Sequence, residues 1–268
     1  MRTSLPAILL TLVVLLACGC SPKPSGVFQG YVEGEYVYLA APLGGALTHL
    51  EVARGDSVRA GQRVFELERQ SEAAAFAQAE KNLSAANASL TLAEATFQRR
   101  KELREDPSAV VSAEELDQAR AQRDSAAADV AAQQAALDKA QWAFDQKQQF
   151  APAAAVVHDA LYRQGEFVAA GNPVVVLLPP ANLKVRFFVP QEKLARVKVG
   201  ETVSVQCDGA ARAFSATVNY ISTEAEYTPP VIFSRETRAN LVFMIEAKFS
   251  PADVADLRPG QPVDVQLP

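Results

Sequence analysis

The chain has 268 residues, a formal net charge of −5 and 49% hydrophobic residues. This balance is ordinary for a folded protein, and no basic run interleaved with aromatic residues indicates a nucleic-acid partner. The chain contains three cysteines, and two of them lie close to the N-terminus. We therefore do not expect disulfides to hold the mature domains together.

The first residues are typical of an export signal. Arg2 precedes an apolar run from Leu5 to Ala17, and a run of about 13 residues is short for a membrane-spanning helix, which needs roughly 20. Residues 1–17 are therefore predicted to be a signal peptide. The sequence LLACGCS resembles a lipobox, which implies that Cys18 is lipidated, with Cys20 as the alternative site. An uncleaved hydrophobic anchor is the other possibility, and each interpretation exports the chain and tethers it to a membrane.

Two later segments repeat each other at one constant offset, the spacing from Gly55 to Gly165. Both segments are β-rich, and they flank an insertion. The pattern predicts one small β-domain, with halves at 36–68 and 150–179, that has been opened by the insertion. The matching positions are Pro42 with Pro152, Gly55 with Gly165, Asp56 with Glu166, Val58 with Val168, Gly61 with Gly171, and Val64 with Val174. The turns of the domain are expected at Gly55, Asp56 and Gly61 in the first half and at Gly165, Glu166 and Gly171 in the second.

The insertion, residues 69–149, is rich in alanine and follows a heptad pattern. Large residues recur every seven positions, alanine tends to follow three later, and Arg123 interrupts the second arm. The only strong break lies near 104–112, so the arms are predicted to fold back antiparallel. The first arm, from about Arg69 to Glu105, would be about 55 Å long at 1.5 Å per residue. The predicted seam residues are Phe76, Leu83, Leu90 and Phe97 in the first arm and Leu116, Val130, Leu137 and Phe144 in the second.

Local structure accounts for the polar residues near the tip of this hairpin. Ser112 precedes AEE, which predicts a capping box with Glu115. Arg99 and Arg100 lie near the end of the first helix, where cations oppose the negative end of the helix dipole.

After residue 180 the pattern changes to strands. They are expected at 183–189, 201–207, 213–221, 241–249 and 262–267, with a short helix at 191–198 and a loop at YTPPVIFS. The sequence predicts a small antiparallel β-barrel over 180–268. Residues 18–35 are expected to supply a linker and a first barrel strand.

The motifs of enzymes are missing from the sequence. No lysine lies between Val64 and Glu72, where a lipoyl or biotinyl carrier would need one. The two histidines, His49 and His158, belong to no HExxH-like set, and no GxxxxGK[ST] phosphate loop occurs. We expect a protein that is not an enzyme, with no catalytic residue, cofactor or metal.

Taken in order, these parts resemble the HlyD-type membrane fusion proteins, which are periplasmic adaptors. GDSVRAGQ and GEFVAAGN carry the likeness in the two half-motifs. LKVRFFVPQEKLARVKVGETVSVQCDG and AEYTPPVIFSRETRANLVFMIEA resemble the YbhG and YhiI type of adaptor that serves ABC exporters. The implied fold is α+β and mainly β: a split lipoyl/biotinyl-like β-domain interrupted by a long antiparallel coiled-coil α-hairpin, followed by a small antiparallel β-barrel.

The resemblance also implies a function and a place in the cell. Such a protein is periplasmic, lipid-anchored to the inner membrane of a Gram-negative bacterium, and assembled into a ring, with six copies expected. It links an inner-membrane transporter, of the ABC rather than the RND class, to a TolC-like outer-membrane channel for efflux or secretion. The implied channel contacts are Arg99, Arg100, Leu103 and Ser112, although the loop after Leu103 is about two residues longer than in the usual tip motif. The alternative is a lipid-anchored coiled-coil scaffold of the envelope without a transport role.

Overall fold

The computed structural model describes residues 26–105, 111–207, 209–210, 212–227, 241–250, 254 and 257–267. The signal segment with Cys18 and Cys20, the tip positions 106–110 and most of YTPPVIFS lie outside the described residues. The chain divides into two compact units, Tyr36–Leu178 and the combination of Met1–Glu35 with Pro179–Pro268. No helix in the described part is long and apolar enough to cross a membrane.

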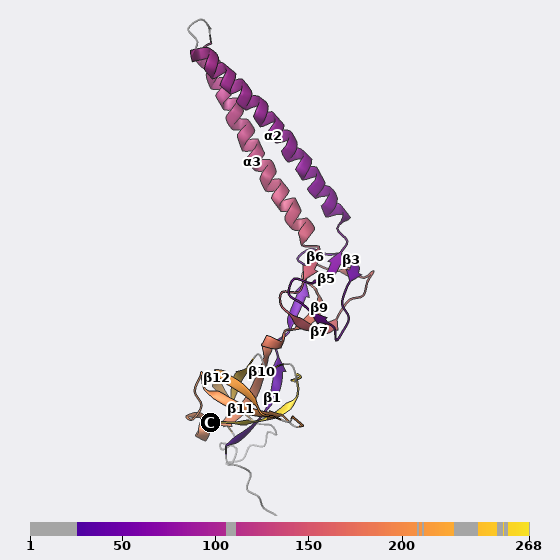
Figure 1. The fold of residues 1–268 in the computed structure, drawn as a ribbon, viewed down its shortest axis with the longest axis vertical. Coiled ribbons are helices and arrows are strands. Elements are labelled where there is room, and N and C mark those ends of the chain that lie inside the picture. Colours follow the sequence, from indigo (N-terminus) through magenta and orange to yellow (C-terminus); the bar gives the residue numbers. More distant parts are fainter. Residues whose placement is uncertain are drawn as a thin grey trace, which may run out of the picture. The chain divides into compact units, whose positions relative to one another are not determined.

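One unit is built around a closed antiparallel barrel with the strand order β1-β10-β13-β12-β11-β14 (Figure 1). Side chains alternate along its strands, so Val185, Phe187 and Val189 are fully buried on the inner side. Two short helices, η1 (Pro180–Asn182) and α4 (Gln191–Leu194), flank β10 in the chain. The strands are β1 (Val27–Gly34), β10 (Leu183–Pro190), β11 (Thr202–Cys207), β12 (Phe214–Tyr227), β13 (Leu241–Phe249) and β14 (Pro262–Gln266).

The first barrel strand comes from a distant part of the sequence. β1 pairs with β10 on one side, with Val32 opposite Val185, and with β14 on the other, with Gly30 opposite Val263. Gly30 is required at this crossing, because a Cβ there would lie 2.4 Å from the carbonyl oxygen of Arg186. The N-terminal segment therefore closes a barrel whose other strands all lie after residue 180.

The other unit contains two four-stranded sheets, in the orders β2-β9-β7-β4 and β6-β5-β3-β8. Each sheet takes strands from both half-motifs. A core of fully buried side chains fills the unit, among them Leu47, Phe65, Leu67 and Leu177. The strands are β2 (Val37–Ala40), β3 (Gly45–Leu50), β4 (Ser57–Val58), β5 (Arg63–Leu67), β6 (Gln148–Phe150), β7 (Ala155–Ala160), β8 (Phe167–Val168) and β9 (Pro173–Leu178).

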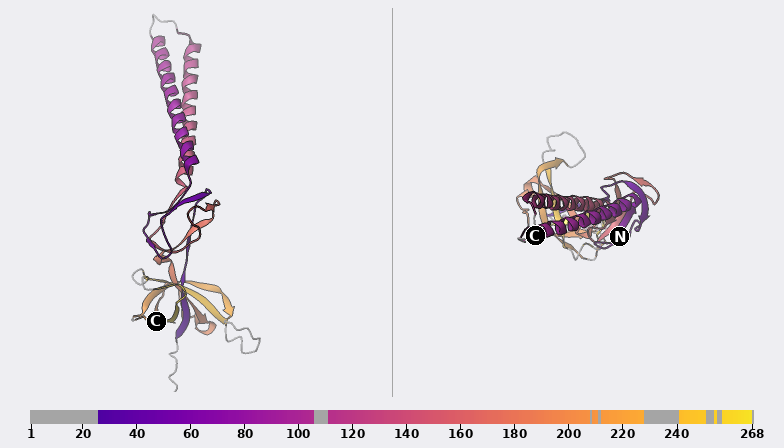
Figure 2. Two further views of the ribbon diagram at one scale, coloured as in Figure 1. Left: turned by 90° about the vertical axis from the view of Figure 1, so that its right-hand side faces the viewer. Right: turned by 90° about the horizontal axis from the view of Figure 1, so that it is seen from above.

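A pair of long helices extends from this second unit. α2 (Gln70–Glu105) follows β5, and α3 (Ala113–Asp145) returns directly into β6. Figures 1 and 2 show the two helices side by side and antiparallel over their length. Strands contain more residues than helices, and a helical hairpin between β-sheets is accompanied by a β-barrel. The predicted fold class is confirmed.

Candidate functional site

The turn glycines of the two half-motifs hold the halves together crosswise. Gly55 donates its N–H to the carbonyl of Val157 at 2.8 Å, and Gly165 donates to the carbonyl of Leu47 at 2.8 Å. The second turns do the same, because Gly61 donates to Ala151 at 2.8 Å and Gly171 donates to Ala41 at 2.9 Å. Every bond therefore joins one half to the other, and each has its counterpart at the repeated position of the other half-motif.

These turns need glycine for their backbone conformation. Gly55 and Gly165 have φ of 93° and 94°, and Gly61 and Gly171 have φ of 75° and 79°. A Cβ at any of the four would meet no atom within 4 Å. Glycine is required here because of the backbone conformation and not because of crowding, since residues with a side chain rarely adopt a positive φ.

The acidic residue after the first glycine of each half closes its turn. Asp56 Oδ2 accepts a hydrogen bond from the N–H of Ala53 at 2.7 Å, and Glu166 Oε2 accepts one from the N–H of Arg163 at 2.9 Å. The first half has Asp56 where the second has Glu166, and both carboxylates accept a hydrogen bond from the backbone N–H three residues earlier. The repeated residues therefore build the domain through backbone and turn hydrogen bonds.

The predicted seam residues lie along one half-buried stripe of each helix. All eight are partly buried, whereas most other positions of α2 and α3 are exposed. The most buried helix positions are Ala79, Ala86 and Ala119, and such small side chains allow a close approach of two helices. Phe76 stacks on Phe144 across the pair, with ring centroids 6.0 Å apart.

Arg123, which interrupts the heptad pattern, is accommodated by an aromatic ring of the other helix. Its guanidinium carbon lies 4.6 Å from the ring centroid of Phe97, and that of Arg120 lies 5.9 Å from the same ring. A cation over an aromatic face is attractive. The sequence showed the interruption but not this partner.

At the tip, two of the four predicted contact residues are engaged within the hairpin. The hydroxyl of Ser112 accepts the N–H of Glu115 at 3.2 Å, and the N–H of Ser112 donates to Glu115 Oε2 at 2.9 Å, which completes a capping box. The hydrogen bond from the Ser112 backbone, followed by that from its hydroxyl, holds the pKa of Glu115 below its ordinary value. Arg100 reaches the same carboxylate from α2, with Nη1 to Oε1 at 3.6 Å.

The other two tip residues face solvent. Arg99 is exposed, and Leu103 keeps 46% of its surface exposed near the end of α2. Isolated exposed leucines are common in folded proteins. Arg99 and Leu103 are nevertheless the predicted contacts that are available to a partner, whereas Ser112 and Arg100 already stabilise the hairpin end.

Sequence reasoning missed a charged cluster on the outer face of the barrel. Lys184, with 9% of its side chain exposed, contacts Glu35 at 2.6 Å and Glu246 at 2.8 Å. Arg186 contacts Glu33 at 2.9 Å and Glu246 at 2.8 Å. These residues alternate with the interior positions of β10, and they join β1, β10 and β13.

Burial and pairing act in opposite directions on these groups. Burial lowers the pKa of Lys184 and of Arg186, but the hydrogen bonds to Glu246 and other partners outweigh it, so both values are raised. Burial raises the pKa of Glu246, and the hydrogen bonds from Lys184 and Arg186 bring it below its ordinary value. All three groups therefore remain charged near neutral pH, and the cluster is best explained as a link between strands.

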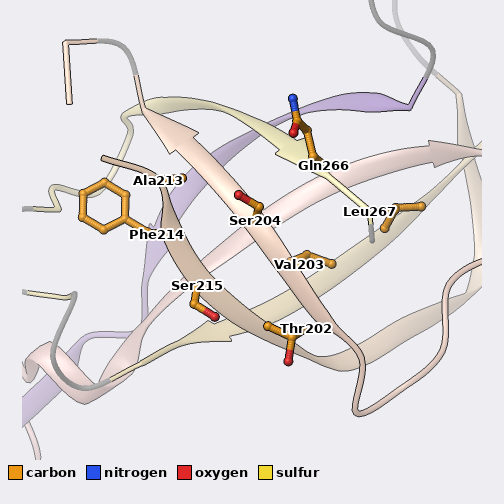
Figure 3. A pocket seen from close by; sticks show the side chains of 8 residues that line it. All are labelled: Thr202, Val203, Ser204, Ala213, Phe214, Ser215, Gln266 and Leu267. Atoms are coloured by element: carbon orange, nitrogen blue, oxygen red, sulfur yellow. The ribbon is translucent and has the colours of Figure 1, made fainter. Parts of the chain in front are cut away.

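One hollow of the described surface has a lining without acidic or basic side chains. It lies on the barrel, and Figure 3 shows the side chains that line it: Thr202, Val203, Ser204, Ala213, Phe214, Ser215, Gln266 and Leu267. This set contains hydroxyls, one amide and apolar groups, and it has no acid or base. Within the described ranges, no group of three or more His, Cys, Asp or Glu residues could hold a metal ion.

Comparison with known proteins connects this geometry to a family. Residues 75–147 match the family model described as "RND MFP, alpha-helical hairpin domain". The UPF0194 membrane protein of Yersinia pseudotuberculosis is 26% identical over 98% of this chain and 97% of its own length. A UPF0194 membrane protein of Acidithiobacillus ferridurans is 30% identical, but the match covers 44% of this chain and 35% of that protein.

A solved structure shares the fold over most of the chain. The membrane fusion protein Spr0693 from Streptococcus pneumoniae R6 is similar with a TM-score of 0.67 and 21% identity, over 91% of this chain and 99% of the other. The hairpin match, the full-length relatives and this fold agree with one another. The chain therefore carries a helical hairpin that matches the membrane fusion protein hairpin model, and it shares the fold of a solved membrane fusion protein.

Proposed function

We propose that this protein is a periplasmic adaptor that links an inner-membrane exporter to a TolC-like outer-membrane channel. The observation that carries the proposal is the long hairpin, which matches the family's hairpin model and extends from an interlocked lipoyl-like domain. A two-helix rod buries one stripe of each helix and exposes most of its other side chains. Its physical use is to reach a partner at a distance, and the adaptor itself is expected to be non-enzymatic.

The tip is the proposed channel contact. Leu103 and Arg99 offer an exposed apolar group and an exposed cation near the end of α2. Arg100, Ser112 and Glu115 would support that surface by fixing the start of α3. In this proposal the exposed pair contacts the channel, and the engaged residues hold the hairpin end in shape.

The transporter is proposed to be of the ABC type, as in the YbhG and YhiI adaptors that the C-terminal half resembles. The RND class is the second candidate, because the description of the matching hairpin model names it. The adaptor would form a ring, with six copies expected. It would relay a conformational change of the transporter to the channel. Such coupling requires that the two transporter states bind the adaptor with different free energies.

The anchor is proposed to be a lipid on Cys18, placed in the inner membrane. Cys18→Ala should remove the lipid mass from the mature N-terminus, as measured by mass spectrometry of the purified protein. A lipid that remains, now on Cys20, would move the cleavage site by two residues but would keep the anchor. If neither the parent protein nor the variant carries a lipid and residues 1–17 are still present, the uncleaved apolar run is the anchor.

The tip contact can be tested by photocrosslinking in living cells. A photoreactive amino acid at Leu103 should crosslink the full-length protein to an outer-membrane channel. The same probe at Leu92, which is 66% exposed on the side of α2, is the matched control and should not reach the channel. Equal yields at both positions, or products with cell-wall components only, would contradict the adaptor and favour the envelope scaffold.

A further inference from the structure

The chain leaves and re-enters the lipoyl-like domain at the base of the hairpin (Figure 1). A buried lysine, Lys147, lies at this joint. Lys147 stands between α3 and β6, and 5% of its side chain is exposed. Its Nζ donates to the carbonyl oxygen of Gly44 at 2.8 Å and lies 2.9 Å from Oε1 of Glu72, in the first turn of α2. One ammonium therefore joins three segments: the first half-motif, the outgoing helix and the returning strand.

The surrounding backbone fits closely around this ammonium. A Cβ on Gly45 would lie 3.3 Å from Lys147 Nζ and 3.3 Å from the carbonyl oxygen of Glu68. The backbone of Lys147 also takes part, because its carbonyl accepts the N–H of Leu67 at 2.8 Å. The backbone and the side chain of Lys147 therefore connect the returning end of the hairpin to the residues where it begins, Leu67 and Glu72.

A second contact crosses the same joint. Arg69 Nε lies 2.8 Å from Oε1 of Glu66 in β5, and its guanidinium carbon lies 4.4 Å from the ring centroid of Phe144 in α3. Phe144 in turn stacks on Phe76 of α2. Strand β5 and both helices are therefore linked by two independent sets of interactions.

The repeat indicates that the lysine serves the hairpin and not the β-fold. At the offset that relates the two half-motifs, Lys147 corresponds to Val37, a partly buried residue that packs against the core. The other half-motif thus forms without a charge at this position. Burying an ammonium costs free energy unless the charge is paired. A hairpin that swings away from Gly44 would carry Glu72 with it, and the ammonium would lose its charged partner.

We propose that Lys147, Glu72 and Gly44 form a latch that fixes the hairpin at one angle to the lipoyl-like domain. With the latch closed, the hairpin and the domain move as a single rigid body, and a rotation of the domain is transmitted to the tip. The inference concerns the joint itself, and it holds whatever the tip binds.

The test is a distance measurement on the full-length mature chain by electron spin resonance. Spin labels are placed at Ser57→Cys in the lipoyl-like domain and at Ser125→Cys in α3, both exposed positions. Cys207→Ala removes the buried thiol and Cys20→Ala removes the second N-terminal thiol, so the only other cysteine is Cys18, whose thiol is blocked by the proposed lipid. We expect one narrow distance distribution. Lys147→Met, which keeps the side-chain length but removes the charge, should broaden the distribution and shift its mean.

Two further variants make the result decisive. Lys139→Met removes an exposed lysine of α3 and should leave the distribution narrow. Glu72→Gln keeps the bond from Lys147 to Gly44, so it should fold even if Lys147→Met does not, and it should broaden the distribution less. Circular dichroism of each variant verifies that both helices are present. A distribution that stays narrow and unshifted in Glu72→Gln and in any folded Lys147→Met would overturn the latch.

Discussion

The lipoyl-like domain and the hairpin belong to one compact unit but are held by different means. In the domain, Leu47, Phe65 and Leu177 are fully buried, and the turn glycines bond each half to the other. Along the described helices, the buried residues are three alanines, and the large seam residues are only half-buried. The domain therefore carries a core of its own, whereas the hairpin depends on a narrow seam and on its attachment at the base.

This difference has a consequence for function. Elements with few buried apolar groups open at lower free energy than a packed core. A change in the seam should therefore disable the rod without unfolding the domain that bears it. The following predictions separate the two regions, from the largest expected effect to the smallest.

The largest effect is expected in the domain core. Phe65→Ala should lower the free energy of unfolding by about 3–5 kcal/mol, because it removes a fully buried ring and leaves a cavity. Phe167→Ala is the matched control, since this phenylalanine of the same domain is 72% exposed. Urea unfolding of both variants measures the difference. Similar losses for the two would contradict the core assignment.

The next effect is expected in the seam. The double variant Leu83→Gln with Leu137→Gln should lower the stability of the hairpin by about 2 kcal/mol. Each substitution removes a half-buried leucine side chain, whose burial contributes roughly 1 kcal/mol. Helical signal in circular dichroism should fall, the domain should still unfold at its own midpoint, and export should stop while the anchored protein stays detectable. Leu92→Gln, an exposed change on α2, should do none of this. Normal export from the double variant would refute the role of the rod.

The crosswise turns should respond symmetrically. Gly55→Ala and Gly165→Ala should each cost about 1–2 kcal/mol, because a Cβ disfavours the positive φ at these positions. Asn tolerates positive φ better than Ala, so Gly55→Asn and Gly165→Asn should cost less. Thermal melts of the four variants check this. A large loss of stability in one of the two alanine variants, with none in the other, would contradict the equivalence of the two turns.

The smallest effect is expected at the tip. Ser112→Ala should cost about 1 kcal/mol through loss of the N-cap, and the loss should be local to the start of α3. Hydrogen exchange at the amide of Glu115 should therefore speed up while the base of α3 is unchanged. Ser125→Ala, in the middle of the same helix, should be neutral. Unchanged exchange at Glu115 would show that the capping box does not hold the helix start.

The sequence predicted those features that repeat. The constant offset between the repeated segments located both half-motifs, and the heptad spacing located the half-buried stripe of each helix. The sequence could not show that the N–H of Gly55 donates a hydrogen bond to the opposite half. Both halves contain similar carbonyl acceptors, and the partner depends on how the strands of the two halves are arranged in the folded domain.

Single residues without periodicity were invisible for a related reason. Lys147 is one of many lysines in the sequence, and its burial depends on Gly44, which lies 103 residues away. Arg123 breaks the heptad pattern, and its contact with Phe97 depends on how the two helices align.

The most direct test of the central claim is to identify what the protein binds in the cell. Mild crosslinking of living cells, affinity purification of the tagged full-length chain and mass spectrometry should recover an ABC permease with its ATPase, together with a TolC-like channel. Recovery of an RND pump would keep the adaptor and change its transporter class. Recovery of neither, with only self-association or cell-wall components, would contradict the adaptor and leave the envelope scaffold in its place.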